Sequence, residues 1–286
     1  MRATPGLELL RSMWRGYRPI FIDFAPRSRP RWGYGRPPHA LLTSVLDASR
    51  EQYEERLREI LGCREHLAGI PLRGDVESRE PFWVNGFLPG LDAAVLYTLV
   101  AHRAPPRYLE IGSGHSTRFV ARAIRDHALA TRIICYDPAP RASVAKLAHE
   151  VHAARLEDVP QGEIADALRP GDILFYDGSH RALENSDVTV FFLELLPRLP
   201  AGVLIQIHDI CLPFDYPPGW EKRWYSEQYL LAAYLLGGAA RVRVMLPNAF
   251  VSQDASLSRI LEPLWSMHAL HGVEPHGSSF WMETVG

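Results

Sequence analysis

Acidic side chains and histidines follow two short apolar segments of the chain. Asp177 comes directly after Asp172–Tyr176, and the pair His208-Asp209 follows Val203–Ile207. If the two segments are neighbouring strands of a parallel sheet, their ends lie only ~5 Å apart. The side chains then converge at the carboxyl edge of the sheet, where ligands bind in open α/β folds. We therefore expect a reaction centre at this edge.

The residue types at this edge suit two kinds of chemistry. Asp177, His208 and Asp209 offer oxygen and nitrogen ligands to Mg²⁺ or another divalent ion. Asp177 and Asp209 also have no obvious basic partner in the sequence, and two close carboxylates repel unless a cation or proton intervenes. The alternative is a metal-free acid/base site. His208 and His180 are then the candidate bases, because histidine titrates near neutral pH, and Asp177 is the third catalytic candidate.

Strand geometry limits the predicted metal site. Successive residues of a strand face opposite sides of the sheet. His208 and Asp209 can therefore share one ligand only if the strand has already ended before them. Of these two residues, Asp209 is therefore the preferred candidate for the metal ligand.

A glycine loop follows another short apolar segment, Arg107–Ile111. Glycine lets the backbone turn tightly and approach a ligand, and a helix that begins there directs its first amide groups toward that ligand. Glu110 ends the segment; its carboxylate would repel a pyrophosphate but suits a cofactor with an amino group and a sulfonium charge. The loop residues that we expect to bind the cofactor are Gly112, Ser113, Gly114 and Ser116, and Asp177 is a further candidate for a cofactor contact.

Two further acidic residues follow the next predicted strands. Asp137 ends Arg132–Tyr136, where a carboxylate can accept both hydroxyls of a ribose. Glu157 follows Val151–Arg155, the position of an adenine contact. Both residues have an alternative interpretation, since Asp137 could cap a turn before Pro138 and Glu157 could belong to a solvated turn.

Strands and helices alternate along the chain from Arg107 onward. Seven strands are predicted: Arg107–Ile111, Arg132–Tyr136, Val151–Arg155, Asp172–Tyr176, Val203–Ile207, Arg241–Leu246 and Ser279–Glu283. The helices between them are Ser116–His127, Arg141–His149, Glu184–Leu196 and Ser226–Leu236. This alternation predicts an α/β fold: a Rossmann-like, doubly wound seven-stranded sheet, mostly parallel with one antiparallel strand.

The region before the first strand lacks this alternation of strands and helices. Residues 1–104 are predicted to form an N-terminal helical and loop extension, and residues 105–286 the cofactor-binding domain. The helical patterns in the extension are Ala40–Leu61 and Gly90–Ala101. Its aromatic residues could cover the active site or form the contact of a homodimer; they are Trp14, Tyr17, Trp32, Tyr34 and Trp83. The segment Trp83–Gly90 is a candidate wall for the cofactor.

Composition excludes several classes of protein. The chain has 286 residues and a formal net charge of -2, so no global field draws it toward nucleic acid or an anionic membrane. The 3 cysteines form neither a zinc motif nor a disulfide framework. The sequence has no apolar run of membrane-spanning length and no signal-peptide pattern at its start. We expect a cytoplasmic protein.

These motifs resemble a known family. The run Glu110-Ile111-Gly112-Ser113-Gly114 looks like the first motif of class I S-adenosylmethionine-dependent methyltransferases, and Asp137 matches their ribose-binding position. Asp177-Gly178-Ser179-His180 and His208-Asp209 are similar to a bacterial branch with macrocin-type O-methyltransferases and cephalosporin hydroxylase relatives, several with a divalent metal. Ser116 replaces the third glycine of the fuller motif, and Arg181 stands where an aromatic residue often follows.

The resemblance implies S-adenosylmethionine as cofactor and O-methylation of a small molecule such as a sugar or natural product, with metal assistance left open. Two alternatives remain. One is an S-adenosylmethionine-binding or metal-dependent enzyme of the same fold with other chemistry, such as hydroxylation. The other is a non-catalytic cofactor-binding protein. An NAD-dependent dehydrogenase fits less well, because Thr117 occupies the last glycine position of GxGxxG.

Overall fold

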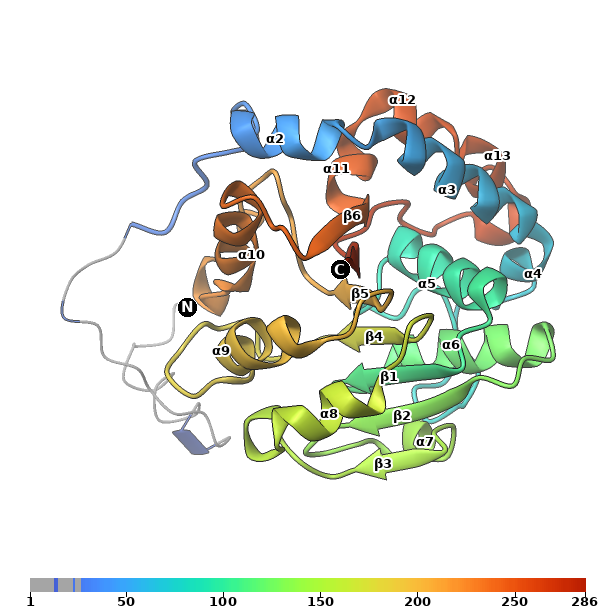
Figure 1. Cartoon of the computed structure of the whole chain (residues 1–286). Helices are drawn as coiled ribbons and strands as arrows, with labels where there is room; N and C mark the ends of the chain where they lie inside the picture. The colour runs from blue at the N-terminus through green and yellow to red at the C-terminus, as the bar shows by residue number, and fades with distance from the viewer. Residues whose placement is uncertain (1–12, 15–22, 24–26) are drawn as a thin grey trace.

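A seven-stranded sheet forms the centre of the computed structural model, which describes residues 13–14, 23 and 27–286 (Figure 1). The strand order is β3-β2-β1-β4-β5-β7-β6. β1 to β5 pair in parallel, and β7 runs antiparallel to both of its neighbours. The predicted doubly wound, mostly parallel sheet is confirmed. The strands are β1 Arg107–Ile111, β2 Arg132–Tyr136, β3 Glu150–His152, β4 Ile173–Tyr176, β5 Leu204–Ile207, β6 Val242–Pro247 and β7 Phe280–Thr284.

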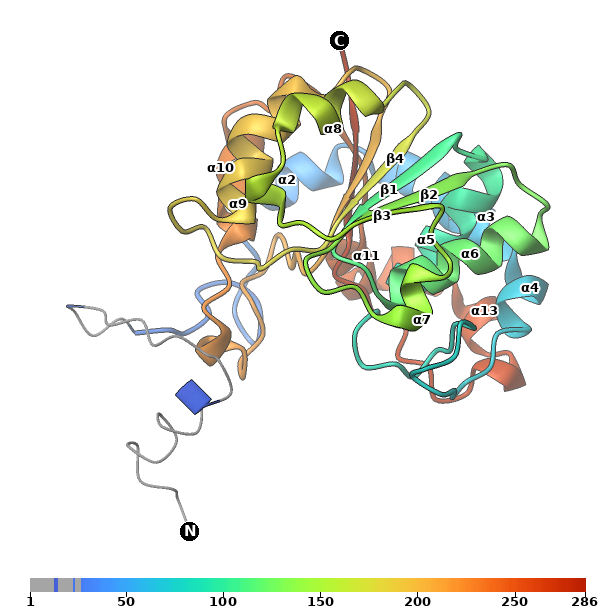
Figure 2. The ribbon, with the colours of Figure 1, turned by 90° about the horizontal axis from the view of Figure 1, so that it is seen from below.

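Helices cover both faces of this sheet. Figure 2 shows α5, α6 and α7 on one side and α8, α9 and α10 on the other. Within the described residues, no helix combines the length and apolarity needed to cross a membrane. The helices are α2 Ala40–Asp47, α3 Arg50–Gly62, α4 Arg64–Ala68, α5 Gly90–Arg103, α6 His115–Asp126, α7 Ala142–Ala145, α8 Gln161–Ala167, α9 Asp187–Val190, α10 Glu227–Leu236, α11 Asn248–Gln253, α12 Ala255–Arg259 and α13 Glu262–Trp265.

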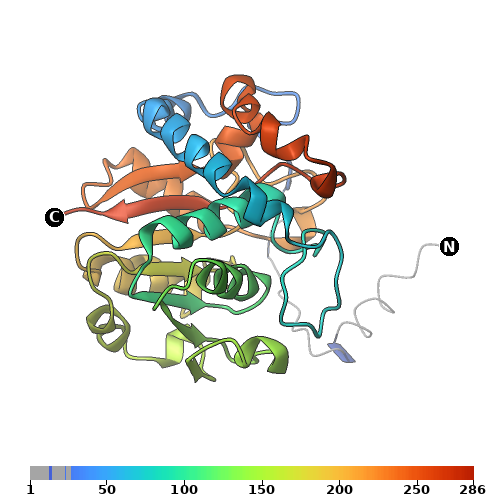
Figure 3. The same ribbon diagram turned by 90° about the vertical axis from the view of Figure 1, so that its right-hand side faces the viewer.

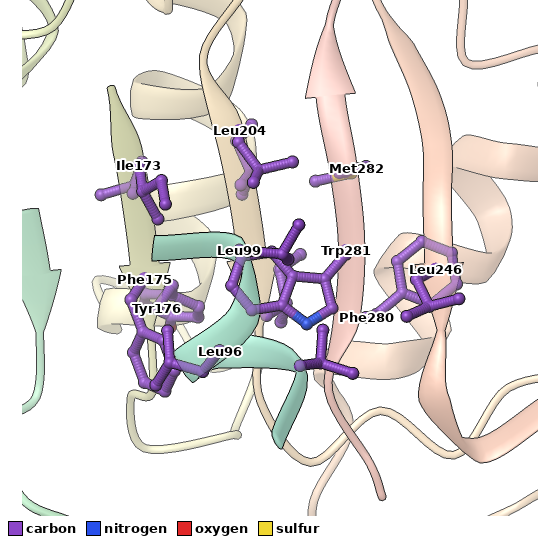
Figure 4. Close-up of a cluster of buried hydrophobic side chains, with 14 of the residues drawn as sticks. Leu96, Leu99, Ile173, Phe175, Tyr176, Leu204, Leu246, Phe280, Trp281 and Met282 are labelled. Atoms are coloured by element: carbon purple, nitrogen blue, oxygen red, sulfur yellow. The ribbon is translucent and has the colours of Figure 1, made fainter. Parts of the chain in front are cut away.

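The central strands are buried on both faces, as their apolar sequences require. Every residue of β4 and β5 is buried, and the one polar side chain, Gln206, donates a hydrogen bond to Ser279 Oγ at 2.6 Å. Leu96 and Leu99 of α5 pack among side chains of β4, β5 and β7 (Figure 4). The helices before β1 thus share one hydrophobic core with the sheet.

The predicted helix Ala40–Leu61 is two helices in the structure. α2 ends at Asp47 and α3 begins at Arg50. The halves bury their apolar faces against different partners: α2 packs on α10, whereas α3 packs on α5 and β6. Figure 3 shows α3 and α5 lying over the same face of the sheet. One continuous helix could not reach both surfaces, so the chain bends between them.

Two helices of the cofactor-binding half also differ from the prediction. Helix Arg141–His149 shrinks to the single turn α7. Helix Glu184–Leu196 begins later, at Asp187, where Ser186 accepts a hydrogen bond from the Thr189 amide and caps the helix. It continues as the π-helical turn η2, Phe191–Leu195, and a short 3₁₀ turn. Helix ends and single turns leave weak periodic signals, which explains these errors.

Candidate active site

The carboxyl ends of β1, β4 and β5 lie side by side and position the reaction centre. Ile111 pairs with Tyr176, which in turn pairs with Ile207. The parallel ladder extends one residue further: the Asp177 amide donates to the Ile111 carbonyl and the His208 amide donates to the Tyr176 carbonyl, both at 2.9 Å. The prediction that the strands before Asp177 and His208 end side by side is therefore confirmed.

The backbone after each strand turns back through left-handed conformations. Asp209 has a φ of 54° and His180 a φ of 63°. Such values are uncommon outside glycine and often mark functional sites. Because β5 ends at Ile207, strand alternation no longer applies, and Asp209 Oδ1 lies 3.6 Å from His208 Nδ1. The strand has thus ended before His208, which was the condition for His208 and Asp209 to face the same space.

Two carboxylates and two imidazoles form a compact cluster, which we call the Asp–His quartet: Asp177, His180, His208 and Asp209. Asp177 Oδ1 lies 3.3 Å from His180 Nε2 and 3.5 Å from His208 Nδ1. Asp209 Oδ2 lies 3.7 Å from His180 Nε2. The two predicted bases therefore face the two predicted acidic groups across one small space.

Each imidazole of the quartet is backed by a buried carboxylate. Glu227, the first residue of α10, lies 2.5 Å from His180 Nδ1. Asp92 of α5 lies 3.5 Å from His208 Nε2 and accepts hydrogen bonds from the Asn248 side chain at 2.7 Å and from two backbone amides. Both carboxylates are fully buried. Neither was predicted, although an acidic residue within the apolar helix Gly90–Ala101 could have drawn attention to Asp92.

The quartet holds its charges in a mutually stabilising arrangement. Burial alone would lower the pKa of His208, but the carboxylates of Asp209 and Asp177 raise it well above its usual value. The pKa of His180 is raised in the same way, against burial, by Glu227 and Asp177. Burial would raise the pKa of Asp177, yet the two imidazoles hold it below its usual range. These imidazoles are therefore unusually strong bases.

The predicted metal site at Asp177, His208 and Asp209 is not supported. Among the described residues, no group of three or more His, Cys, Asp or Glu side chains has an arrangement that could hold a metal ion. The prediction assumed that the two aspartates lacked basic partners. His180 and His208 are those partners, and their positive charge relieves the carboxylate repulsion that had suggested a metal.

Glu110 lies inside the protein rather than on a cavity wall. Its carboxylate is fully buried and accepts hydrogen bonds from the hydroxyls of Ser116 and Thr117, and from Tyr108 at 3.1 Å. Burial raises its pKa to about 7. The structure thus places Glu110 and Ser116 where they fasten the start of α6 to β1; whether Glu110 contacts a cofactor stays a prediction.

The glycine loop leads directly from β1 into α6. Gly112 has a φ of 81°, and a Cβ at this position would collide with the carbonyl oxygen of Asp177. Glycine is therefore required for the loop to pass this close to β4. Asp137 Oδ2 accepts hydrogen bonds from the amide and the hydroxyl of Ser113, at 2.9 and 2.6 Å. The predicted ribose-binding carboxylate thus lies beside the loop, and Glu157 lies partly exposed in the short turn η1, Leu156–Asp158.

Two cavities meet at the quartet. A small one of about 80 Å³ is lined by the glycine loop, from Ser113 to Ser116. A larger one of about 680 Å³ is lined by the whole segment Trp83–Gly90 and by aromatic residues that include Tyr34, Trp220 and Tyr225. The residues that line both cavities are Phe87, Leu88, Asp177 and His208. A ligand at the glycine loop and a ligand in the larger cavity would therefore meet at this common wall. Of the aromatic residues predicted to cover the site, Tyr17 lies outside the described residues.

Comparison with known proteins finds one family model that resembles part of this chain. Residues 109–210 match the family model described as "Methyltransferase domain". The match covers less than half of the chain. It supports the predicted methyltransferase, while membership of the macrocin-type or cephalosporin hydroxylase branch stays a prediction. No curated protein matches the chain.

Solved structures resemble this chain only loosely. An O-methyltransferase from Bacillus cereus in complex with SAH has 17% identity and a TM-score of 0.40, covering 81% of this chain and 91% of its own. An SAH-bound methyltransferase from Podospora anserina has 18% identity and a TM-score of 0.36, covering 53% and 71%. Likenesses this low leave the function to be argued from the site itself.

The stretch that matches the family model does not contain the whole candidate site. The glycine loop, Asp137 and the quartet all fall within residues 109–210. Asp92 and Glu227, the carboxylates behind the two imidazoles, come from α5 before this stretch and α10 after it. The flanking segments are therefore part of the candidate active site.

Proposed function

We propose that this protein transfers the methyl group of S-adenosylmethionine to a hydroxyl oxygen of a small-molecule acceptor. The observation that carries the proposal is the common wall of the two cavities, where Asp177 and His208 lie between the glycine loop and the larger space. Methyl transfer is an in-line displacement that depends mainly on the alignment of two bound reactants. Two cavities that meet at one wall provide that alignment.

The residues at the glycine loop fit the cofactor. The backbone at Gly112 approaches β4 closely, Asp137 lies beside the loop with carboxylate lone pairs to spare for ribose hydroxyls, and His115 turns a buried ring into the small cavity. When bound, S-adenosylmethionine supplies an electrophilic methyl group on a sulfonium. The adjacent carboxylate of Asp177 suits that positive charge.

The quartet supplies the base for the acceptor. Neutral His208 would accept the hydroxyl proton at Nδ1, the nitrogen that faces Asp177 and Asp209, while the charge of Asp92, 3.5 Å from Nε2, favours this ring orientation. The same two aspartates stabilise the imidazolium that results. Because they raise the pKa of His208, the neutral fraction of this base and hence the transfer rate should increase as the pH rises above 6.5, the usual histidine value.

The larger cavity suits a small organic acceptor. Its volume of about 680 Å³ lies within the ~300–1,000 Å³ typical of small-molecule sites. Aromatic side chains line it together with hydrogen-bonding groups, an arrangement that can hold the apolar face and the hydroxyls of a sugar or natural product.

Calorimetry with S-adenosylhomocysteine, NAD and 2-oxoglutarate tests the cofactor. We expect only S-adenosylhomocysteine to bind; binding of NAD or 2-oxoglutarate alone would contradict the proposal. The transfer step is tested with S-adenosylmethionine labelled in its methyl group and a panel of glycosides and phenols. His208→Gln should keep cofactor affinity and lose label transfer, whereas His271→Gln, a change at an exposed histidine, should keep both. Full transfer by His208→Gln would remove His208 as the base.

A further inference from the structure

Arg223 brings a positive charge to the wall of the larger cavity. It is exposed and ends the short 3₁₀ turn η4, Glu221–Arg223, in the loop between β5 and α10. Of the described residues, no other lysine or arginine lines this cavity. The amide of Arg223 donates to the carbonyl of Trp220 at 2.8 Å. Side chains three residues apart eclipse one another in a 3₁₀ turn, so the turn sets Arg223 over the Trp220 ring.

Two aromatic rings hold this guanidinium in place. Its Cζ lies 4.0 Å from the centre of the Trp220 ring and 5.5 Å from the centre of the Tyr225 ring, and both rings line the larger cavity. A guanidinium that stacks on an aromatic face keeps the N–H groups of its edge free to bind an oxyanion with two hydrogen bonds. The two rings thus restrict a long, exposed side chain and leave its hydrogen-bonding edge to a ligand.

The acidic side chains around Arg223 have other partners. Each carboxylate that lines the larger cavity has an imidazole neighbour: Asp177 and Asp209 lie in the quartet, and Glu274 Oε2 lies 3.6 Å from a histidine Nδ1. Glu221, two residues before Arg223, accepts a hydrogen bond from a backbone amide at 2.7 Å. In the part of the chain that the structure describes, Arg223 forms no salt bridge. Its charge is therefore available to a ligand.

Tyr225 connects this charge with the reaction centre. Its ring centre lies 4.4 Å from that of His180, a member of the quartet. Arg223 Cζ is therefore no further from the His180 ring than the sum of this distance and the 5.5 Å that separates it from Tyr225. A compound of one or two rings can span such a distance, and the larger cavity, of about 680 Å³, has room for it.

We propose that the methyl acceptor carries an oxyanion, a carboxylate or a phosphate, and that Arg223 binds this group. The inference rests on the proposed function and names the class of its acceptor, a small hydroxylated ring compound with a negative charge. The carboxylates of Asp177 and Asp209 disfavour a further anion at the quartet, so the acceptor binds with its hydroxyl toward the quartet and its anion toward Arg223. Arg223 determines specificity and takes no part in proton transfer.

Matched compounds that differ in charge test this subsite. The first set is phenyl glucoside, phenyl glucuronide, and phenyl glucoside phosphorylated at its primary hydroxyl. The second is para-hydroxyphenylacetate and its neutral amide. Calorimetry measures their affinities with and without S-adenosylhomocysteine. At least one anionic member should bind wild-type protein about tenfold or more tightly than its neutral partner, as expected for a charged hydrogen bond. The carboxylate and phosphate members then show which oxyanion the subsite prefers.

Two neighbouring substitutions locate the preference. Arg223→Gln changes an exposed side chain and should fold normally; it should keep the affinity for the neutral compounds and lose the preference for the anionic ones. The matched control, Lys222→Gln, removes the same charge from an adjacent exposed residue that is not part of the cavity lining. It should keep the preference. A preference that survives in Arg223→Gln would overturn the assignment.

The remaining outcomes separate this inference from the proposed function. Equal affinity of wild-type protein for the members of every set would overturn the anion subsite. Binding of S-adenosylhomocysteine without binding of any compound in either set would overturn it as well, and would leave the proposed function standing. A clear preference for the anionic compounds in a protein that binds no S-adenosylhomocysteine would have the reverse meaning: the subsite would stand, and the proposed function would fail.

Discussion

The buried carboxylate of Glu110 makes the stability of this protein depend on pH in a measurable way. Burial raises its pKa from an ordinary 4.5 to about 7, despite the hydrogen bonds that it accepts from Ser116, Thr117 and Tyr108. The folded state then binds more protons than the unfolded state between these two values. The contribution of Glu110 to the free energy of unfolding is fully present below pH 4.5 and is lost as the pH rises through 7.

The size of this effect follows from the shift. A difference of 7 − 4.5 = 2.5 pKa units corresponds to about 3 kcal/mol, at 1.36 kcal/mol per unit. Glu110→Gln has the same shape and cannot titrate. The free energy of unfolding of the variant, relative to wild type, should therefore increase by about 3 kcal/mol between about pH 4 and about pH 8.

Urea unfolding followed by tryptophan fluorescence across this pH range measures the difference. Other titrating groups cancel, because they are common to both proteins. A difference between the two unfolding free energies that stays constant with pH would refute the assigned burial and charge of Glu110. Unimpaired binding of S-adenosylhomocysteine by Glu110→Gln would in addition show that this carboxylate holds the loop and does not contact the cofactor.

Three other substitutions test separate parts of the site. Gly112→Ala should destabilise the fold by roughly 1–3 kcal/mol, because of the positive φ and the collision with the Asp177 carbonyl; an unchanged urea midpoint would argue against the tight turn. Asp92→Asn should slow methyl transfer ~10–100-fold through loss of a charged partner of His208, with cofactor affinity retained; a wild-type rate would deny Asp92 its orienting role. Asp137→Ala should weaken S-adenosylhomocysteine binding by roughly 1–3 kcal/mol in calorimetry, and the ribose assignment fails if affinity is kept.

Sequence patterns located the strands and their ends well. β1 and β2 have the predicted bounds, because both are short, mostly apolar segments in which every residue after the first is buried. The convergence of Asp177 with His208 and Asp209 followed from the same pattern, since parallel strands end at one edge. The direction of the Glu110 side chain could not be predicted in this way, because it depends on the hydroxyls that α6 brings to it.

Partners from distant segments were beyond the reach of these patterns. Asp92 and Glu227 meet the imidazoles through tertiary packing of α5 and α10, and nothing in the local sequence relates them to a strand end. The metal prediction was wrong for the same reason. Sequence order does not show a basic partner for Asp177 and Asp209, whereas the fold brings His180 against both of them.

A crystal structure of the complex with S-adenosylhomocysteine tests the central claim most directly, since that claim concerns where the methyl group is delivered. The geometry of the site predicts ribose hydroxyls bonded to Asp137 and the sulfur at the wall formed by Asp177 and His208, facing the larger cavity. A complex in which the sulfur lies away from this wall, or in which the ligand leaves the glycine loop empty, would contradict it.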